Sequence, residues 1–410
     1  MQFDFAVLGA NGIQGKIVVR DLLESGYSVL LCANDDYKLD SLLEYKRADL
    51  AYIDLRRIEK VKRVLKKSGA NVVVNCAIDD YNLAINRLAL ELDAHYVDLG
   101  GGPRESEEKM TFEQLALDGE FKKREIVGIV GMGSTPGINN VMLRYVEPKF
   151  DTIHTVQLGF TWNSNMPSFV PPFSLDAIDL EFREKATVLE NGKFILKDPE
   201  DCTLDYEYRS IGKQKTYYTK HIEPHTVHKF LEHKGVKNIA VFSSFPEHSR
   251  SAIKKLIELG FTSRDMLEID GQKVQPLTHT IEILRRLPVP DGYVEKENLW
   301  VKVFGTKNDK EKVVEMDAVA GTLLGWEEHT CNVDTGMPVS ITAQMIKNRI
   351  IAEPGMYSPE FIVPPQPFFE ELGKRGIWIY ENGRKINSPA TTTAMQNILP
   401  QPTVAKKLAV

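Results

Sequence analysis

The chain has 410 residues and a formal net charge of −6 at pH 7, with 42% hydrophobic and 26% charged residues. This length favours two domains, the composition is that of a globular enzyme, and the charge excludes the basic surface on which nucleic-acid binding depends. No apolar run approaches the roughly 18 residues of a membrane span, so no membrane anchor is expected. The four cysteines form no Cys-x-x-Cys pair, which predicts a reduced, cytoplasmic protein without a disulfide framework or a metal site.

The N-terminal stretch predicts a strand, a glycine turn and a helix. An apolar run covers residues 3–8, glycines follow at positions 9, 12 and 15, and residues 16–23 have helical spacing. This order is typical of the first unit of a dinucleotide-binding domain, whose glycines let the backbone approach a pyrophosphate. Asn11 stands where the second glycine usually lies, and a glycine turn without a nucleotide is the alternative. The cofactor-binding candidates of this stretch are Gly9, Asn11, Gly12, Ile13 and Gln14.

Acidic residues lie at the ends of the second and third expected strands. Asp35 ends the strand over 28–33, about 20 residues after the glycine turn, where an acid accepts hydrogen bonds from ribose hydroxyls and repels a 2′-phosphate. We therefore expect NAD as the cofactor, with NADP possible because Lys38 is near. Asp54 lies near the end of the strand expected over 51–55 and either borders the adenine pocket or caps the helix expected over 57–67.

Three later strand ends carry further candidates. Asn75 and Ala77 end the apolar run over 71–77 and are expected beside the nicotinamide. Asp98, with Tyr96, ends a strand before Gly100, and it either faces a ligand or satisfies backbone N–H groups in the glycine turn. Further on, after a helix expected over 112–123 and a strand over 126–130, Pro136 and Gly137 start a helix capped by Ser134 or Thr135, or they hold a substrate carboxylate or the cofactor.

The pattern changes after residue 152. Short strands alternate with irregular stretches, a hairpin is expected over 301–316, and helices are expected near Pro338 and over 368–374. The long loop over 163–172 is a candidate lid. Trp162 just before it and Phe169 within it either cover the substrate or lie in the core. We predict an α/β fold: a Rossmann doubly wound parallel sheet over 1–140 and an inserted α+β substrate and dimerisation domain of mixed, largely antiparallel sheet over 141–335. A segment over 336–388 then returns to the first domain, and a tail covers 389–410.

Six segments in this order carry a resemblance to a known family: 9–15, 72–77, 95–98, 133–139, 221–226 and 336–345. The chain resembles the saccharopine dehydrogenase-like oxidoreductases, a family that includes lysine epsilon-dehydrogenases, saccharopine reductases and carboxynorspermidine dehydrogenases. The resemblance implies hydride transfer between NAD(P) and a C–N bond of an amino acid or related amine through an imine, in a homodimer paired through the second domain. Thr135 stands where saccharopine reductases usually carry an aspartate, which favours a lysine epsilon-dehydrogenase-type reaction. The alternatives are reductive condensation of an amine with a carbonyl and a non-catalytic nucleotide-binding protein.

The candidate chemistry centres on a histidine-rich stretch. Residues 221–233 hold four of the nine histidines, with spacings that match neither a zinc-binding helix nor a finger. The resemblance implies that His221 and Glu223 face the substrate, where one of them acts as a base; a solvated loop and a metal site are the alternatives. The catalytic candidates are His221, Glu223 and Asp98, and the substrate-binding candidates are Tyr96, Thr135, Pro136, Gly137 and Arg183.

Two choices stay open at this point. Arg183 is one of four arginines suited to a substrate carboxylate, the others being Arg104, Arg209 and Arg250. Cys76, near the expected crevice, is either a packed thiol or the nucleophile of a thioester-forming dehydrogenase.

Overall fold

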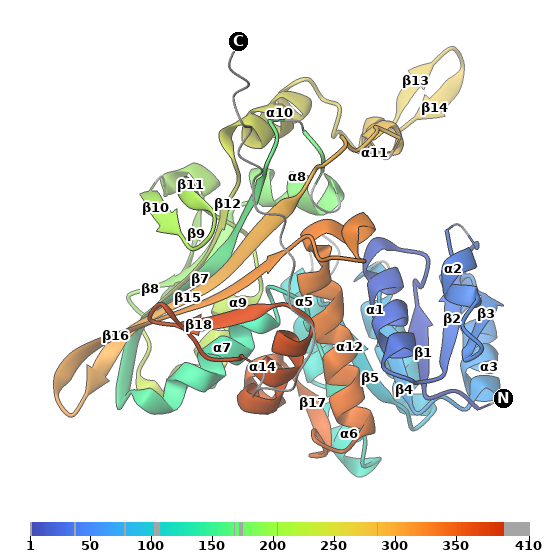
Figure 1. Cartoon of the computed structure of the whole chain (residues 1–410), viewed down its shortest axis with the longest axis horizontal. Helices are drawn as coiled ribbons and strands as arrows, with labels where there is room; N and C mark the ends of the chain where they lie inside the picture. Colours follow the sequence, from blue (N-terminus) through green and yellow to red (C-terminus); the bar gives the residue numbers. More distant parts are fainter. Residues whose placement is uncertain are drawn as a thin grey trace, which may run out of the picture.

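The computed structural model describes residues 2–36, 38–77, 79–101, 107–167, 169–171, 175–202, 204–284 and 286–388. The expected C-terminal tail over 389–410 lies outside these ranges, as does the candidate Arg104. Two sheets organise the described chain, and Figure 1 shows them side by side with helices around them.

The first sheet has seven strands, all parallel, in the order β3-β2-β1-β4-β5-β6-β17. The order of its first six strands is that of a Rossmann fold, which confirms the predicted fold class. Their bounds are β1 (Phe5–Leu8), β2 (Val29–Ala33), β3 (Ala48–Tyr52), β4 (Val72–Asn75), β5 (His95–Asp98), β6 (Val127–Ile129) and β17 (Gly355–Tyr357).

Both faces of this sheet are buried, as expected for parallel strands. Phe5 and Val7 of β1 lie in one hydrophobic core, whereas Ala6 and Leu8 lie in another on the opposite face. The helices of this half are α1 (Ile13–Glu24), α2 (Asp40–Leu43), α3 (Ile58–Ser68), α4 (Asn82–Glu91), α5 (Glu107–Leu115), α6 (Asp118–Lys123) and α7 (Ile138–Val146). The single helix expected over 112–123 is therefore two helices, with residues 116 and 117 between them.

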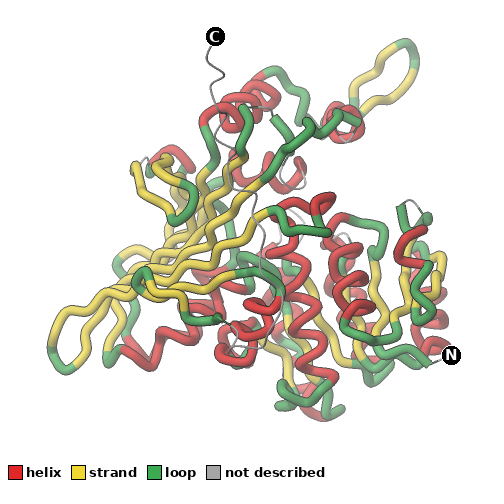
Figure 2. Tube along the Cα trace, viewed as in Figure 1, coloured by secondary structure: helices red, strands yellow, loops and turns green. Residues whose placement is uncertain are grey.

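The second sheet has ten strands and is mixed but largely antiparallel (Figure 2). Its centre is β7 (Thr152–Ser164), paired on one side with β15 (Glu295–Lys307) and on the other, in parallel, with β12 (Asn238–Ser244). The hairpin of β15 and β16 (Lys310–Gly321) confirms the expected one and is longer than the sequence indicated. The remaining strands are β8 (Ala186–Glu190), β9 (Lys193–Lys197), β10 (Leu204–Tyr208), β11 (Gly212–Tyr218), β18 (Trp378–Glu381) and β19 (Arg384–Lys385).

Helices and a separate hairpin surround this sheet. The helices are α8 (Leu175–Arg183), α9 (Glu223–Leu231), α10 (Glu247–Glu258) and α11 (Pro276–Leu284). The hairpin of β13 (Leu267–Ile269) and β14 (Gln272–Val274) forms a two-stranded sheet of its own and projects from the body of the molecule (Figure 1).

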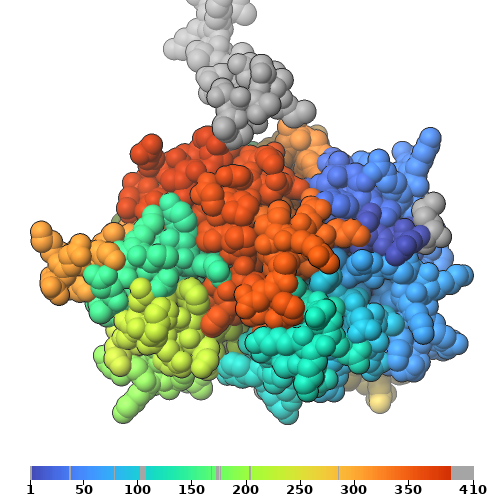
Figure 3. Space-filling view, turned by 90° about the horizontal axis from the view of Figure 1, so that it is seen from below, coloured from blue at the N-terminus to red at the C-terminus, as the bar shows by residue number. Residues whose placement is uncertain are grey.

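The last part of the chain contacts both sheets. Helix α12 (Val333–Lys347) packs on α1, β4 and β5, β17 extends the parallel sheet, and β18 pairs with β16. Figure 3 shows this orange-to-red segment between the blue N-terminal part and the green and yellow middle part. Two further helices, α13 (Pro359–Ile362) and α14 (Pro365–Lys374), belong to it. The domain boundaries at residues 140, 335 and 388 stay a prediction.

Helix α12 begins five residues before the expected start near Pro338, which lies inside it. Local preference disfavours a proline within a helix, but tertiary packing decides here. A Cβ added to Gly336 would lie 2.5 Å from the Ile17 side chain of α1, so the two helices are in close contact at this glycine.

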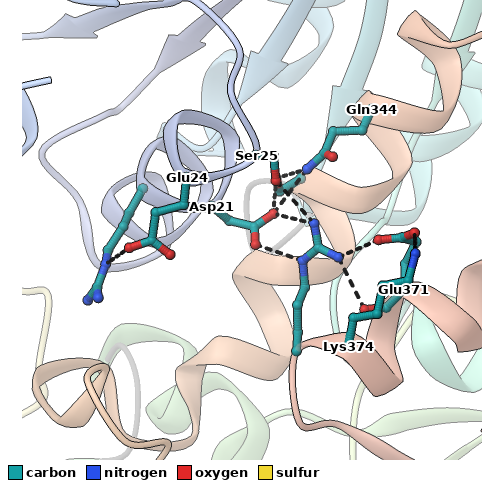
Figure 4. A network of polar contacts seen from close by, with 9 residues as sticks. Asp21, Glu24, Ser25, Gln344, Glu371 and Lys374 are labelled. Carbon is teal, nitrogen blue, oxygen red and sulfur yellow. Dashed lines mark hydrogen bonds and ion pairs between the residues drawn. The ribbon is translucent and has the colours of Figure 1, made fainter. Parts of the chain in front are cut away.

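A buried polar network joins α1 to the last segment (Figure 4). The Arg375 guanidinium, just after α14, donates to both carboxylate oxygens of Asp21 at 2.7 and 3.1 Å, and Ser340 of α12 donates to the same carboxylate at 2.6 Å. Breaking such a buried pair leaves an unpaired charge and typically costs about 3–5 kcal/mol. The network therefore holds α1, α12 and α14 in one arrangement.

Candidate functional site

The glycine turn after β1 has the geometry of an anion-binding site. A Cβ on Gly15 would lie 2.0 Å from the Gly9 carbonyl oxygen, so only glycine allows α1 to pack this closely on the turn. Gly12 precedes α1, and no side chain caps the helix. The first N–H groups of α1 are therefore left for a negatively charged group, and a pyrophosphate fits here.

Asp35 lies at the edge of this turn. The Asn11 side-chain amide donates to Asp35 Oδ1 at 2.7 Å and to Asn34 Oδ1 at 2.9 Å, so the residue that replaces the usual glycine fixes the end of β2. A cavity of about 780 Å³ opens beside it between α1 and α2, and Ile13, Lys16 and Lys38 are part of its lining.

Three other cofactor candidates, Asp54, Gln14 and Asn75, have hydrogen-bond partners within the protein. Asp54 accepts a hydrogen bond from the Arg56 backbone N–H and caps a short 3-10 helix, which is the capping alternative in a shorter form. The Gln14 side chain donates to Asn332 before α12. Asn75 is buried, donates to Asn82 and accepts from the Ala77 N–H, so it braces the turn after β4.

Asp98 and Tyr96 are both fully buried inside the first half of the chain. The Asp98 carboxylate accepts hydrogen bonds at 2.7–2.8 Å from the backbone N–H groups of Gly100 and Gly131, the Tyr96 hydroxyl and the Gln114 amide. Burial raises the pKa of Asp98, while these donors stabilise its charged form. The geometry thus favours the structural alternative for Asp98, and it gives Tyr96 no exposed surface for a substrate.

The segment after β6 places Thr135 at the carboxyl edge of the parallel sheet. The Thr135–Pro136 peptide is cis, and the Gly137 N–H donates to Asn140 Oδ1 at 2.9 Å at the start of α7. Neither Ser134 nor Thr135 caps that helix; instead the Thr135 hydroxyl donates to Glu223 Oε1 at 2.6 Å. Thr135 thereby connects the two halves of the molecule.

Three side chains from the second half meet this edge. His221 lies just before α9, Glu223 is the first residue of α9, and Glu181 comes from α8. His221 Nδ1 is 3.2 Å from Glu223 Oε2, and its Nε2 is 3.9 Å from Glu181 Oε1. Glu223 is fully buried, whereas His221 keeps 13% of its side chain exposed. The structure therefore brings His221, Glu223 and Thr135 together, with Nδ1 toward Glu223 and Nε2 toward Glu181.

We call His221, Glu223 and Glu181 the His221 triad. The charges of these three side chains are set by burial and by mutual contact. Burial disfavours the charged imidazolium, but the Glu223 and Glu181 carboxylates outweigh it and hold the pKa of His221 well above its usual value. Burial disfavours charge on Glu223 as well, but His221 lowers the pKa of that carboxyl, and the helix N-terminus also favours its negative charge. Burial raises the pKa of Glu181. His221 therefore carries a proton at neutral pH.

The remaining sequence candidates are engaged elsewhere. Arg183 is exposed and bonds to Asp179 and Thr262, and Arg250 stacks on Tyr217 and pairs with Glu200. Arg209 pairs with Asp317. Cys76 has a pKa raised by burial, which is the property of a packed thiol. The structure thus gives none of these arginines a place beside His221.

Sequence reasoning missed three carboxylates. Glu295 and Glu297 lie on β15, and Asp334 is the second residue of α12. Glu295 and Asp334 are buried, and Glu297 is half-buried. A signal was present: both glutamates share the odd-numbered face of β15 with the buried Leu299 and Val301, and acids at apolar-face positions are unusual.

Two kinds of feature are absent from the described residues. No group of three or more His, Cys, Asp and Glu side chains in these ranges has the arrangement to hold a metal ion. No helix within them has both the length and the apolar character to cross a membrane.

Comparisons with known proteins agree with the two-part fold. The family model of the saccharopine dehydrogenase NADP binding domain matches residues 5–129, and that of the saccharopine dehydrogenase C-terminal domain matches residues 133–377. Carboxyaminopropylagmatine dehydrogenase of Synechocystis sp. is 23% identical over 90% of this chain and 95% of its own length. Carboxynorspermidine synthase of Vibrio alginolyticus is 24% identical over 81% of this chain and 82% of its own. The saccharopine dehydrogenase (L-Glu forming) of Saccharomyces cerevisiae has the same fold, with a TM-score of 0.72, 13% identity, and coverage of 94% of this chain and 100% of that one.

Proposed function

This chain belongs to the saccharopine dehydrogenase family, as an NAD(P)-dependent oxidoreductase, and we propose that it reduces an imine formed between an amine and a carbonyl compound. When bound, the nicotinamide supplies or accepts the hydride. The names of the two relatives describe carboxylated polyamines and support a polyamine-like amine substrate.

The observation that carries this direction is the contact of His221 with Glu223 and Glu181, which holds the pKa of the imidazole well above its usual value and favours its protonated form. Condensation of an amine with a carbonyl gives a carbinolamine, whose hydroxyl must leave as water before the C=N bond can be reduced. The His221 imidazolium, fixed by Glu223 at Nδ1, holds its Nε2 proton for that hydroxyl and acts as a general acid. Glu223, whose oxygens contact the Thr135 hydroxyl and His221 Nδ1, keeps the imidazolium in this orientation. Oxidation of a free amine would instead need a neutral base at this position.

The lysine epsilon-dehydrogenase-type reaction stays a prediction and ranks second. Thr135 is the residue that favoured it, and its hydroxyl contributes to the site by donating to Glu223. The third alternative, a non-catalytic nucleotide-binding protein, receives no support from the His221 triad. The roles of His221, Glu223, Thr135 and Glu181 are part of this proposal, and we assign Asp98 a structural role.

An absorbance assay of the nicotinamide tests the proposal. Purified protein is incubated with reduced cofactor and with butane-1,4-diamine, glyoxylate or both. The mass of the product is then measured by mass spectrometry. We expect consumption of reduced cofactor only with both reactants, and a secondary amine as product. Formation of reduced cofactor from NAD and lysine alone would establish the second-ranked reaction instead. Cofactor binding without turnover in any arm would favour the non-catalytic alternative.

We also propose NAD as the preferred cofactor and a homodimer in the cytoplasm. Asp35 beside Asn11 supports NAD, although Lys16 and Lys38 line the neighbouring cavity. Exposed apolar side chains over residues 259–289, including Leu267 and Ile269 of the projecting hairpin, support an interface there. The free cysteines fit a reducing compartment. Light scattering with chromatography and initial rates with NADH and NADPH test the first two points.

A further inference from the structure

One fully buried carboxylate takes no part in the proposed chemistry. Glu360 is the second residue of the short helix α13, which follows β17 in the last part of the chain, and its side chain is 0% exposed. Burying a carboxylate is costly, and it is tolerated where its oxygens have hydrogen-bond donors. The contacts of Glu360 therefore indicate what this residue does.

The Glu360 carboxylate holds a side-chain amide of α7. Its Oε2 accepts a hydrogen bond from Asn140 Nδ2 at 2.9 Å, and Asn140 is itself only 1% exposed. One turn further along α7, the Arg144 guanidinium donates to the Glu360 backbone carbonyl at 3.0 Å. The side chain and the backbone of one residue therefore join α13 to two successive turns of α7.

The acceptor at Glu360 determines how the Asn140 amide is oriented. An asparagine side chain has an oxygen that accepts and a nitrogen that donates. Asn140 Oδ1 accepts from the Gly137 N–H at 2.9 Å, so the nitrogen of the same amide must face an acceptor on its other side. A reversed amide would place its nitrogen against the Gly137 N–H, donor against donor. Glu360 therefore supplies the acceptor that this orientation requires.

Gly137 ends the tight loop that carries Thr135. The Gly133 N–H donates to the Pro136 carbonyl at 2.8 Å, and a Cβ on Gly137 would lie 2.0 Å from the Gly133 carbonyl oxygen. The Thr135 hydroxyl in this loop donates to Glu223 Oε1 at 2.6 Å. Because so closely packed a loop moves as one body, a shift of the Gly137 N–H also displaces the Thr135 hydroxyl.

Helix α13 also contacts the helix on the other side of that hydrogen bond. The ring of Phe361, next to Glu360, packs edge-on against Phe230 of α9, with ring centroids 5.3 Å apart. One small cavity is lined by residues of α7, α9 and α13 together. Helix α9 begins with Glu223, and α7 begins directly after the loop of Thr135. Helix α13 therefore bridges the two helices whose N-terminal ends carry the Thr135–Glu223 contact.

We propose that Glu360 is a positioning residue of the His221 triad. It acts through Asn140 on the loop that carries Thr135, and so on the Thr135–Glu223 hydrogen bond. The inference rests on the proposed function, because it assigns Glu360 to the site that the triad forms. The Thr135 hydroxyl stabilises the Glu223 carboxylate, and this carboxylate stabilises the His221 imidazolium. Loss of the acceptor at Glu360 therefore weakens the charge pair of the triad.

An NMR titration of the full chain with isotope-labelled histidine tests the proposal without turnover. The signal of His221 is identified by its loss in His221→Asn. Glu360→Met removes the acceptor, Glu360→Asp withdraws it by one methylene, and Glu360→Gln keeps an oxygen that accepts. We expect Glu360→Met and Glu360→Asp to lower the measured pKa of His221 by about one unit, since the triad loses a hydrogen bond to a charged group. Glu360→Gln should keep the wild-type value.

Two controls separate a positioning role from a merely structural one. Glu370→Met on α14 changes an exposed acid in the same part of the chain, and it should leave the titration of His221 unchanged. In a Thr135→Val background the hydroxyl that contacts Glu223 is absent, so Glu360→Asp should no longer shift the pKa of His221. Thermal unfolding and NAD affinity are measured for every variant.

The outcomes separate this proposal from the proposed function. An unchanged pKa of His221 in Glu360→Met and Glu360→Asp, with a lower unfolding temperature, overturns the positioning role. An equal shift in Glu370→Met, or a shift by Glu360→Asp that persists in the Thr135→Val background, overturns it as well. If Glu360→Met does not fold, Glu360→Asp and Glu360→Gln decide the question. A shifted titration beside a silent condensation assay supports the positioning role and refutes only the proposed reaction.

Discussion

The glycine turn and the His221 triad differ in how they are assembled. The turn is made of residues 9–15, which are contiguous in the chain, and its backbone geometry follows from the positions of three glycines. The triad takes His221 and Glu223 from the start of α9, Glu181 from α8 and its contact Thr135 from the end of the first half. Local chemistry therefore specifies cofactor binding, whereas the substrate site depends on how the two sheets meet.

The largest effect is expected at the triad. His221→Asn keeps a hydrogen-bonding group but removes the transferable proton, so we expect kcat to fall by about 10²–10⁴-fold with cofactor affinity unchanged. His233→Asn is the matched control, because this histidine belongs to the same stretch but is 60% exposed and pairs with Glu147. Initial rates and cofactor titration give both quantities. Equal losses in both variants would contradict the role of His221.

The turn is tested by a change of one methyl group. Gly15→Ala places a Cβ against the Gly9 carbonyl, so we expect α1 to shift, cofactor affinity to fall, and stability to drop by about 1–3 kcal/mol. Gly119→Ala on α6 meets open space and should stabilise the protein by about 0.5–1 kcal/mol. Thermal unfolding with and without NAD measures both. An unchanged NAD affinity in Gly15→Ala would show that the turn does not hold the cofactor.

Two further acids, Glu297 and Asp334, predict a pH dependence of stability. Asp334 and Glu297 have raised pKa values in the folded state, so between about pH 4 and pH 8 the folded chain binds more protons than the unfolded chain. The contribution of the pair to stability is therefore fully present at low pH and is lost as pH rises toward 8. Glu297→Gln removes one acid, and we expect it to stabilise the ligand-free protein by about 1–2 kcal/mol at pH 8 relative to its effect at pH 5. Denaturant unfolding at the two pH values measures this difference, and a pH-independent effect would contradict the raised pKa of Glu297.

The smallest effect concerns cofactor preference. Asp35→Ala removes the acid beside Asn11, and we expect the ratio of kcat/KM for NADH to that for NADPH to fall about fivefold, since an exposed charge interacts weakly. Asp49→Ala on the exposed part of β3 should leave the ratio unchanged. A wild-type preference for NADPH would show instead that Lys16 and Lys38, which line the cavity beside the glycine turn, determine the cofactor preference.

The sequence by itself determined the parallel sheet, the glycine turn, the mixed second sheet and the family. Each depends on short-range patterns: apolar runs of strand length, glycines where backbones approach closely, and a fixed order of segments. The resemblance to the family also indicated that His221 and Glu223 face the substrate together.

Only the tertiary structure decided which polar groups meet. Asp98 has the sequence position of a ligand-facing residue, yet four donors enclose it; Gln114 and Gly131, which supply two of them, are 16 and 33 residues away. Glu295 and Cys331 are 36 positions apart in the sequence, and they meet because the residues just before α12 pack on β15 while α12 packs on the parallel sheet. Contacts between residues so far apart in the sequence depend on how whole helices and strands pack. Local sequence patterns therefore do not predict them.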